Sequence, residues 1–133
     1  MMICSISSYS QLRIQNFGIS QGLPQSQVLT IAEDSQGYLW LGTLGGGVSR
    51  FDGSAFETFT SRNGLINNFV RDVQIDANDH VWIATNKGIS FYDGIKFHNL
   101  NITEQEGRYV TNIFFDASET IYLLDNGETG KIW

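Results

Sequence analysis

Short segments of this chain alternate between hydrophobic and polar residues with a period of two. Such alternation predicts β-strands, because successive side chains of a strand point to opposite faces of a sheet. In the first half of the chain the predicted strands are residues 27–33, 38–43, 47–52 and 55–60. In the second half they are residues 69–75, 80–85, 88–93 and 96–100. No stretch shows the 3.6-residue period of a helix, so we expect an all-β chain with almost no helix.

The two sets of strands are copies of one repeat. Trp82 lies 42 residues after Trp40, and Tyr122 takes the place of a third tryptophan 40 residues further on. Four strands in about 42 residues, joined by tight turns, are typical of one blade of a β-propeller. We therefore predict a β-propeller of four-stranded antiparallel blades.

The repeat also divides the chain into predicted units. Residues 12–17 align with the outermost strand of the first copy at 56–60, so we expect an orphan outer strand that closes the ring onto the last blade. The predicted blades are residues 27–60, residues 69–100 and, as a partial blade, residues 109–133. A closed ring needs at least about four blades. Residues 12–133 are thus expected to form an incomplete propeller of about three blades plus the closing strand.

An incomplete ring leaves a blade face without a neighbour. Blades bury their apolar faces only against each other, so we expect the last blade to expose Ile113, Phe115 and Tyr122. Two interpretations follow for the missing blades: the protein continues past Trp133, or several chains assemble into one ring.

The first eleven residues, MMICSISSYSQ, fall outside the repeat. They are moderately apolar but lack the basic start and the longer apolar run of a complete secretory signal. We expect residues 1–11 to be either the remnant of a signal or a disordered N-terminus. Cys4 is the one cysteine of the chain, which excludes an internal disulfide bond.

Composition narrows the classes of partner and cofactor. The net charge is −6 and the eight basic residues are scattered, so we expect no nucleic-acid partner. No apolar run approaches the ~20 residues of a membrane-spanning helix, so we expect no direct membrane insertion. The two histidines do not have the spacing of zinc ligands, and we predict neither a metal nor another cofactor.

Certain residues recur at the same place in both copies and are predicted to be structural. We expect Asp34 to cap a β-turn, Gly37 to adopt a positive φ in it, and Trp40 to wedge between blades. Calcium binding at this turn is the alternative, but a calcium site needs six to eight oxygens and these are not in position. The full set is Asp34, Gly37, Trp40, Thr43, Gly47, Asp52 and Gly53 in the first copy, and Asp76, Trp82, Thr85, Gly88, Asp93 and Gly94 in the second.

The glycine-rich stretch at residues 44–47 has two interpretations. A phosphate-binding loop would need a strand before it, a helix after it and usually a following lysine with serine or threonine. Here a predicted strand follows, and the second copy retains only Gly88 of the run. The stretch is therefore predicted to be a turn in which glycine supplies a positive φ.

Residues that do not repeat are the better candidates for binding, because the variable loops of repeat proteins usually form the binding face. Amides, hydroxyls and charges that suit sugar hydroxyls gather in the loops between blades and in the turns after the second strands. Solvated loops are the alternative for any one of them. The predicted ligand-binding residues are Gln25, Ser26, Gln27, Arg62, Asn63, Asn67, Asn68, Asn86, Lys87, Arg108 and Tyr109.

We predict no enzymatic activity and no catalytic residues. The chain has no Ser-His-Asp set in a plausible register, and its carboxylates sit mostly in turns rather than as a facing pair. The repeated aromatic residues could stack on sugars, but their fixed register favours packing in the core.

Two stretches resemble the two-component regulator propeller repeat: GLPQSQVLTIAEDSQGYLWLGTLGGGVSRFDGSAFETFT and GLINNFVRDVQIDANDHVWIATNKGISFYDGIKFHNL. The shared pattern is Gly-Leu, Val, Asp, Trp, Thr, Gly and aromatic-Asp-Gly. The resemblance implies a periplasmic or extracytoplasmic sensor domain of a hybrid histidine kinase that binds glycan fragments. It implies no universal catalytic residues, and any kinase activity would belong to segments outside this chain.

Three function classes therefore remain open. The first is a ligand-binding sensor module, with an oligosaccharide or another small ligand and the remaining blades as partners. The second is a short chain that oligomerises with other copies into a lectin-like ring. The third is a fragment of a propeller lyase or hydrolase. Fold alone does not separate them.

Overall fold

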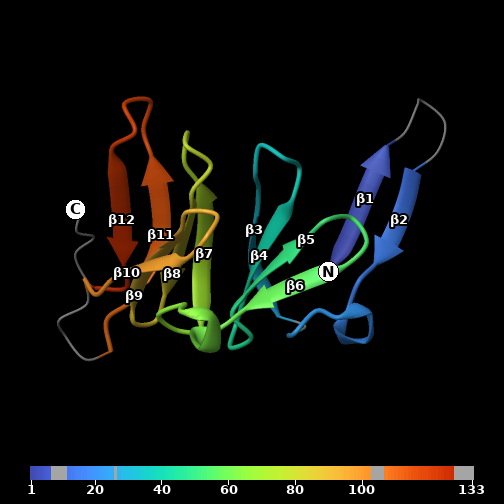
Figure 1. The fold of residues 1–133 in the computed structure, drawn as a ribbon, viewed down its shortest axis with the longest axis horizontal. Helices are drawn as coiled ribbons and strands as arrows, with labels where there is room; N and C mark the ends of the chain where they lie inside the picture. Colours follow the sequence, from blue (N-terminus) through green and yellow to red (C-terminus); the bar gives the residue numbers. More distant parts are fainter. Residues whose placement is uncertain (7–11, 26, 103–106, 128–133) are drawn as a thin grey trace.

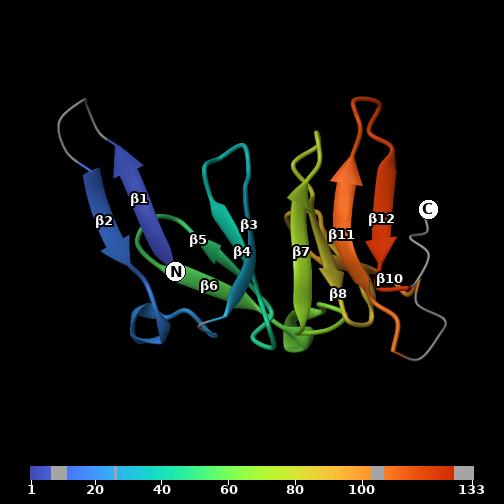
Figure 2. The same ribbon diagram turned by 180° about the vertical axis from the view of Figure 1, so that it is seen from behind.

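The computed structural model describes residues 1–6, 12–25, 27–102 and 107–127 (Figure 1). Its sheets stand side by side in chain order, as the two views of Figures 1 and 2 show. Blade 1 has the strand order β3-β4-β5-β6 and blade 2 the order β10-β9-β8-β7, both antiparallel throughout. Two further sheets, β1-β2 and β11-β12, have two strands each. The predicted all-β fold of four-stranded blades is confirmed.

The strands lie within one residue of the predicted bounds. Blade 1 comprises β3 (Val28–Glu33), β4 (Leu39–Thr43), β5 (Val48–Phe51) and β6 (Phe56–Phe59). Blade 2 comprises β7 (Val70–Ile75), β8 (Val81–Thr85), β9 (Gly88–Tyr92) and β10 (Phe97–Leu100). Blade 3 is the pair β11 (Val110–Phe115) and β12 (Ile121–Asp125). The helical content of the described residues is two short 3₁₀ turns, η1 (Ile19–Gln21) and η2 (Ser61–Asn63), in the loops that enter blades 1 and 2.

The N-terminal segment differs from the sequence prediction. Residues Met2–Ile6 form β1, which pairs antiparallel with β2 (Leu12–Asn16), so β2 has a strand partner of its own. The backbones of Met1 and Phe17 extend the pairing, with Phe17 N–H donating to the Met1 carbonyl at 2.8 Å. This local pairing satisfies backbone groups that an irregular end would leave to water.

The β1-β2 pair is attached to blade 1 by aromatic contacts. The Phe17 ring lies 4.8 Å from that of Phe51 and 6.0 Å from that of Phe56, both edge-on. These contacts cover the outer part of the face of blade 1 that points away from blade 2. Ile31 on the same face of β3 is exposed.

The main core lies between blades 1 and 2. Alternate residues of each strand form this layer, such as Trp40 from β4, Val73 from β7 and Ile83 from β8, as expected when successive side chains of a strand take opposite faces. The buried residues of this layer are Trp40, Val48, Phe59, Leu65, Val70, Val73, Val81 and Ile83. A second layer between blades 2 and 3 buries Ala84, Ile89, Val110, Ile113 and Leu123.

A buried carboxylate joins the inner strands of all three blades. Asp72 on β7 is only 5% exposed. Its Oδ1 accepts from the Thr30 hydroxyl of β3 at 3.1 Å, and its Oδ2 accepts from Ile113 N–H of β11 at 2.8 Å. Gln74 also donates its side-chain amide to this carboxylate. Because a buried charge is tolerated only when hydrogen-bonded, Asp72 fixes the three inner strands at their mutual spacing.

The outward face of blade 3 carries different residues from those predicted. Ile113 is 4% exposed and Phe115 packs edge-on against Trp82, so both point toward blade 2. The exposed apolar residues are their neighbours on the opposite face, Phe114 (63% exposed) and Leu124 (48% exposed). Tyr122 shares that outer face and is half-buried beside Phe114. The prediction selected the wrong alternate set of β11, and a shift of one residue exchanges the two faces of a strand.

Candidate ligand-binding face

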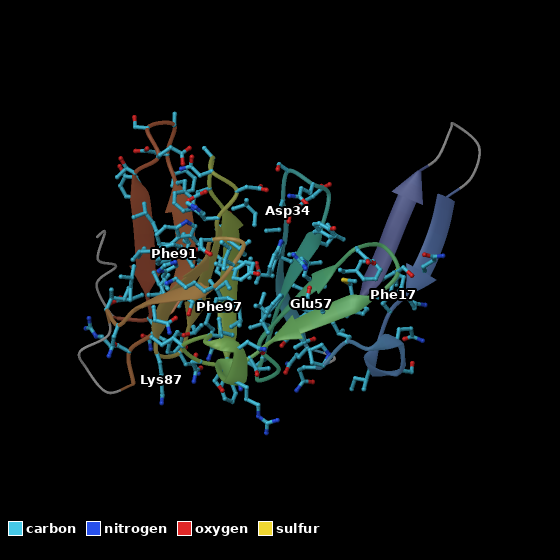
Figure 3. The ribbon with its side chains drawn as sticks, viewed as in Figure 1. Phe17, Asp34, Glu57, Lys87, Phe91 and Phe97 are labelled. Carbon is cyan, nitrogen blue, oxygen red and sulfur yellow. The ribbon has the colours of Figure 1, made fainter. Side chains whose placement is uncertain are left out.

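The blades have two ends with different chemistry. We call the end formed by the β3-β4, β7-β8 and β11-β12 turns the turn face. The opposite end, formed by the loops entering each blade and the residues after β4, β8 and β12, is the loop face. Figure 3 shows Asp34 toward the turn face and Lys87 at the loop face, with its side chain directed away from the ribbon.

On the turn face, an aspartate organises each turn. Asp34 Oδ1 accepts from the N–H groups of Gln36 and Tyr38, both at 3.0 Å. Its Oδ2 accepts from Trp40 Nε1 at 2.8 Å, a bond that the sequence pattern did not predict. Asp76 and Trp82 repeat this bond at 2.8 Å in blade 2. The carboxylates of Asp34 and Asp76 are therefore occupied by donors of their own blade.

The same hydrogen bonds change the acidity of the turn aspartates. Partial burial alone would raise the pKa of Asp76, but hydrogen bonds from Trp82 and His80 outweigh it, and the pKa lies below its ordinary value. The backbone N–H of Thr120 is the main reason that the pKa of Asp116 is lowered. Both groups are therefore carboxylates at neutral pH, as acceptor-only roles require.

Adjacent turns are also joined to each other. Asp79 of blade 2 accepts from Ser35 of blade 1 through the backbone N–H at 2.9 Å and the hydroxyl at 2.8 Å. Glu119 of blade 3 accepts from Ala77 N–H of blade 2 at 3.3 Å. Both acidic residues have a left-handed backbone, with φ of 65° and 61°. Gly37, with φ of 85°, occupies this position in blade 1.

The aspartate and glycine pairs after β5 and β9 form a further set of turns. Asp52 Oδ1 accepts from the N–H groups of Ser54 and Ala55, and Gly53 has φ of 98°. Asp93 and Gly94 repeat this turn, with φ of 93° at the glycine. These residues shape the chain between the third and fourth strands.

On the loop face, the backbone of the neighbouring loop binds the glycine-rich turn after β4. The N–H groups of Gly45 and Gly47 donate to the Asn68 carbonyl at 3.1 and 3.0 Å. The buried Thr43 hydroxyl donates to the Gly47 carbonyl at 2.8 Å, and in blade 2 Thr85 does the same to Gly88 at 2.9 Å. The N–H groups of Gly45 and Gly47 are thus already engaged, in agreement with a turn.

Three of the predicted asparagines use their side chains to shape the loop that enters blade 2. Asn63 Oδ1 accepts from Thr60 N–H at 2.9 Å, Asn67 Oδ1 from Phe69 N–H at 3.0 Å, and Asn68 Oδ1 from Ser61 N–H at 2.7 Å. Their oxygens are therefore part of the scaffold.

The remaining predicted residues of blades 1 and 2 are spread over the loop face. Gln25 lies half-buried beside Gly46, and the carbonyl of the exposed Gln27 accepts from Leu44 N–H at 3.1 Å. Arg62 in η2 and Lys87 after β8 are exposed. Ser26 lies outside the described residues.

Where blades 2 and 3 meet, the structure brings together three residues that we call the arginine cluster: Arg71, Asn86 and Tyr109. Arg71 Nε donates to Asn86 Oδ1 at 2.8 Å. The guanidinium carbon lies 4.4 Å from the centroid of the Tyr109 ring, which is a cation–π contact. All three side chains are half-buried. The cluster is thus a fixed, solvent-reachable cation on the loop face.

Local backbone features hold the cluster in place. A register shift between Val70 and Asp72 in the β7-β8 pairing falls on Arg71. Such bulges redirect a side chain out of the regular alternation. Asn86 N–H donates to the Phe69 carbonyl at 3.1 Å, which positions the amide beside Arg71.

Tyr109 is anchored separately. Its N–H donates to Asn126 Oδ1 at 2.9 Å, and its carbonyl accepts from Asn126 N–H at 3.1 Å. Next to it, Arg108 forms an ion pair with Asp125 at 3.3 Å. Two of the predicted residues, Asn86 and Tyr109, therefore belong to the arginine cluster, whereas Arg108 is paired within blade 3.

Sequence reasoning missed Arg71, which lies in a predicted strand. The signal was its variation between repeats: the residue after the repeated valine is Leu29, Arg71 or Thr111 in the three copies. A strand position that varies beside a repeated valine is a candidate for binding in the same way as a variable loop.

In the part of the chain that the structure describes, no three or more His, Cys, Asp or Glu side chains are grouped so as to hold a metal ion. Within the same residues, no helix has the length and apolar character needed to cross a membrane.

The sheet order and the repeat define a protein of the β-propeller class. Residues 22–45 and 64–87 each match the family model described as two component regulator propeller, so these two stretches are similar to repeats of that family. The resemblance read from the sequence is confirmed. A search of curated proteins found no match.

The solved structures similar to this chain include two extracellular domains from B. thetaiotaomicron. One is the extracellular domain of a protein described as the hybrid two component system BT3049 of B. thetaiotaomicron, with a TM-score of 0.69 and 27% identity. It matches 83% of this chain, which spans only 17% of that domain. The other, described as the extracellular domain of BT4673 of the same organism, has a TM-score of 0.67 and 23% identity, with 77% of this chain and 15% of that one covered. The second supports the fold alone.

Proposed function

We propose that this chain is a ligand-binding module of an extracytoplasmic sensor propeller, and that its ligand is a glycan fragment held on the loop face. The observation that carries the proposal is the arginine cluster, in which side chains from two blades are fixed together at a solvent-reachable position. The similar structure with 27% identity is described as the extracellular domain of a hybrid two component system. In this proposal the chain binds and does not catalyse, and signalling output belongs to other segments.

The contrast between the two faces supports this choice of site. On the turn face, the carboxylate oxygens of Asp34 and Asp76 accept hydrogen bonds from N–H groups of their own blades. On the loop face, the side chains of the cluster come from β7, from the residue after β8 and from the residue before β11. A ligand that contacts them touches two blades at once, so its binding depends on how these blades sit together.

Hydrogen exchange with a panel of short neutral and uronic-acid oligosaccharides tests the proposal. We expect a bound oligosaccharide to slow exchange at residues 66–71 and 107–110 by at least about tenfold, because ligand binding suppresses local opening. Residues 34–38 of the turn face should be unchanged. Asn86→Ala should reduce the protection, whereas the matched change Asn78→Ala on the turn face should not. Protection confined to the turn face, or none with any oligosaccharide, would contradict the proposal.

A second function, assembly of several chains into a lectin-like ring, is favoured by one observation. Phe114 and Leu124 are exposed on the outward face of blade 3, and large exposed apolar patches mark interaction sites. Under this proposal light scattering of the purified chain gives one discrete oligomer, and Phe114→Asp converts it to a monomer. A monomeric wild-type chain would exclude the ring.

A further inference from the structure

The guanidinium of Arg71 is a positive charge without a negative partner among the described residues. The ion pairs found there join Arg50 with Glu57, Arg108 with Asp125, His80 with Asp76 and His98 with Asp93. The adjacent carboxylate of Asp72 is directed to the inner strands, where it binds Thr30 and Ile113. An unpaired arginine is notable in a chain with 14 acidic and only 8 basic residues.

The rest of the loop face adds to this positive charge. Its described segments, residues 18–25, 27, 44–47, 61–69, 86–87, 107–109 and 126–127, contain no aspartate or glutamate. Arg62 and Lys87 are exposed on this face, and the charge of Arg108 is balanced by Asp125. Glu104 and Glu106 belong to the loop entering blade 3 and lie outside the described residues. The described residues of this face therefore carry a net positive charge, opposite in sign to the net charge of the chain as a whole.

The orientation of the guanidinium is fixed on two sides. Nε is held by Asn86 and one side of the group lies against the Tyr109 ring. No described residue accepts a hydrogen bond from the two Nη groups of Arg71. Two parallel N–H groups on a planar cation match the two oxygens of a carboxylate, and a partly buried, pre-oriented arginine binds it more strongly than a free one.

We infer that Arg71 binds a carboxylate of the ligand, so that the loop face takes an acidic saccharide, one that contains a uronic acid, in preference to a neutral one. The inference rests on the proposed function, because it names the ligand class of the same site. Asn86 and Tyr109 act as positioning residues for the arginine. A purely structural role, in which Arg71 only ties blade 3 to blade 2 through Tyr109, is the alternative that the experiment must separate.

Isothermal titration calorimetry of the whole chain with paired ligands distinguishes a carboxylate-binding role of Arg71 from a purely structural one. The probes are oligogalacturonate, oligoalginate and a hyaluronan tetrasaccharide, each as the free acid and as its methyl ester. Esterification removes the charge and leaves the sugar chain intact. We expect each bound acid to lose at least about tenfold in affinity on esterification, the effect of one charge-assisted bidentate pair. Citrate and succinate show whether a free carboxylate suffices or the sugar is required.

Variants assign the effect to Arg71. In Arg71→Gln the acid and its ester should bind equally weakly, whereas Lys96→Gln, which removes one positive charge beside Asp93, should retain the full difference. This non-additivity does not arise if Arg71 is only structural, because a general loss of stability weakens both ligands alike. Asn86→Ala keeps the charge of Arg71 but releases its guanidinium, so part of the difference in affinity between acid and ester should be lost. This variant provides the test if Arg71→Gln does not fold.

The outcomes distinguish the two proposals. Equal affinity of the wild-type chain for acids and esters overturns the carboxylate assignment and leaves the sensor proposal standing. The same holds if the difference persists in Arg71→Gln. Absence of binding to every neutral and acidic saccharide overturns both.

Discussion

Replacing Trp40 with alanine is expected to lower the free energy of unfolding by about 4 kcal/mol, because it removes the largest fully buried side chain and leaves a cavity between blades 1 and 2. Trp40 is 2% exposed, and its ring centroid lies 5.7 Å from those of both Phe59 and Tyr92. The change also removes the indole donor that Asp34 accepts. Urea unfolding followed by circular dichroism measures the loss as a lower midpoint at an unchanged slope.

The matched control is Trp82→Ala in blade 2. Trp82 makes the same bond to its aspartate but is only half-buried, between Phe91 and Phe115. Its loss should be about half as large, since the transfer and cavity contributions scale with the buried volume. Equal losses for the two tryptophans would show that burial between blades 1 and 2 does not set the contribution of Trp40.

Replacing Gly47 with alanine is expected to cost about 3 kcal/mol. The residue has φ of 80°, where a Cβ costs about 1–2 kcal/mol. That Cβ would also lie 2.2 Å from the carbonyl oxygen of Phe59, so the backbone of β6 would have to move, and such overpacking adds a cost of about 1–3 kcal/mol. Chemical unfolding of the purified variant gives the value directly.

Gly53→Ala is the control for the backbone contribution. Its φ of 98° is similarly left-handed, but nothing lies within 4 Å of the added Cβ. We expect a loss of about 1–2 kcal/mol, from the backbone conformation alone. If both glycine variants lost the same free energy, steric contact with Phe59 would have no part in the requirement for Gly47.

The blades could be predicted from the sequence because their information is local and repeated. Each strand alternates, each turn contains its own aspartate and glycine, and Trp40 and Trp82 keep one register. These signals act within a few residues, so the strand bounds were correct to within one residue.

Which residues meet across blades could not be predicted in the same way. Ile113 and Phe114 are adjacent and both apolar, so alternation alone did not tell which of them faces blade 2. The β1-β2 pairing was missed because residues 2–6 carry no copy of the repeat from which to infer a strand.

The arginine cluster was found only in part, for a related reason. Asn86 and Tyr109 lie in loops, where variable residues are expected to bind. Arg71 lies in a strand, and the register shift that directs its side chain to the loop face follows from the pairing of β7 with β8. The contact between Arg71 and Tyr109 depends on how blade 3 packs on blade 2, which is set by the buried layer between them.

The contacts from Asp79 to Ser35 and from Glu119 to Ala77 give the row of blades a direction. In each, a carboxylate of the later blade accepts from a turn of the earlier one. A duplicate of blade 2 would therefore contain a copy of Asp79, whose carboxylate can accept from the turn of the blade that precedes it. A duplicate of blade 1 would lack this acceptor, because Gly37 has no carboxylate to offer. Growth of such a chain by repeat duplication is expected to proceed from the second blade onward.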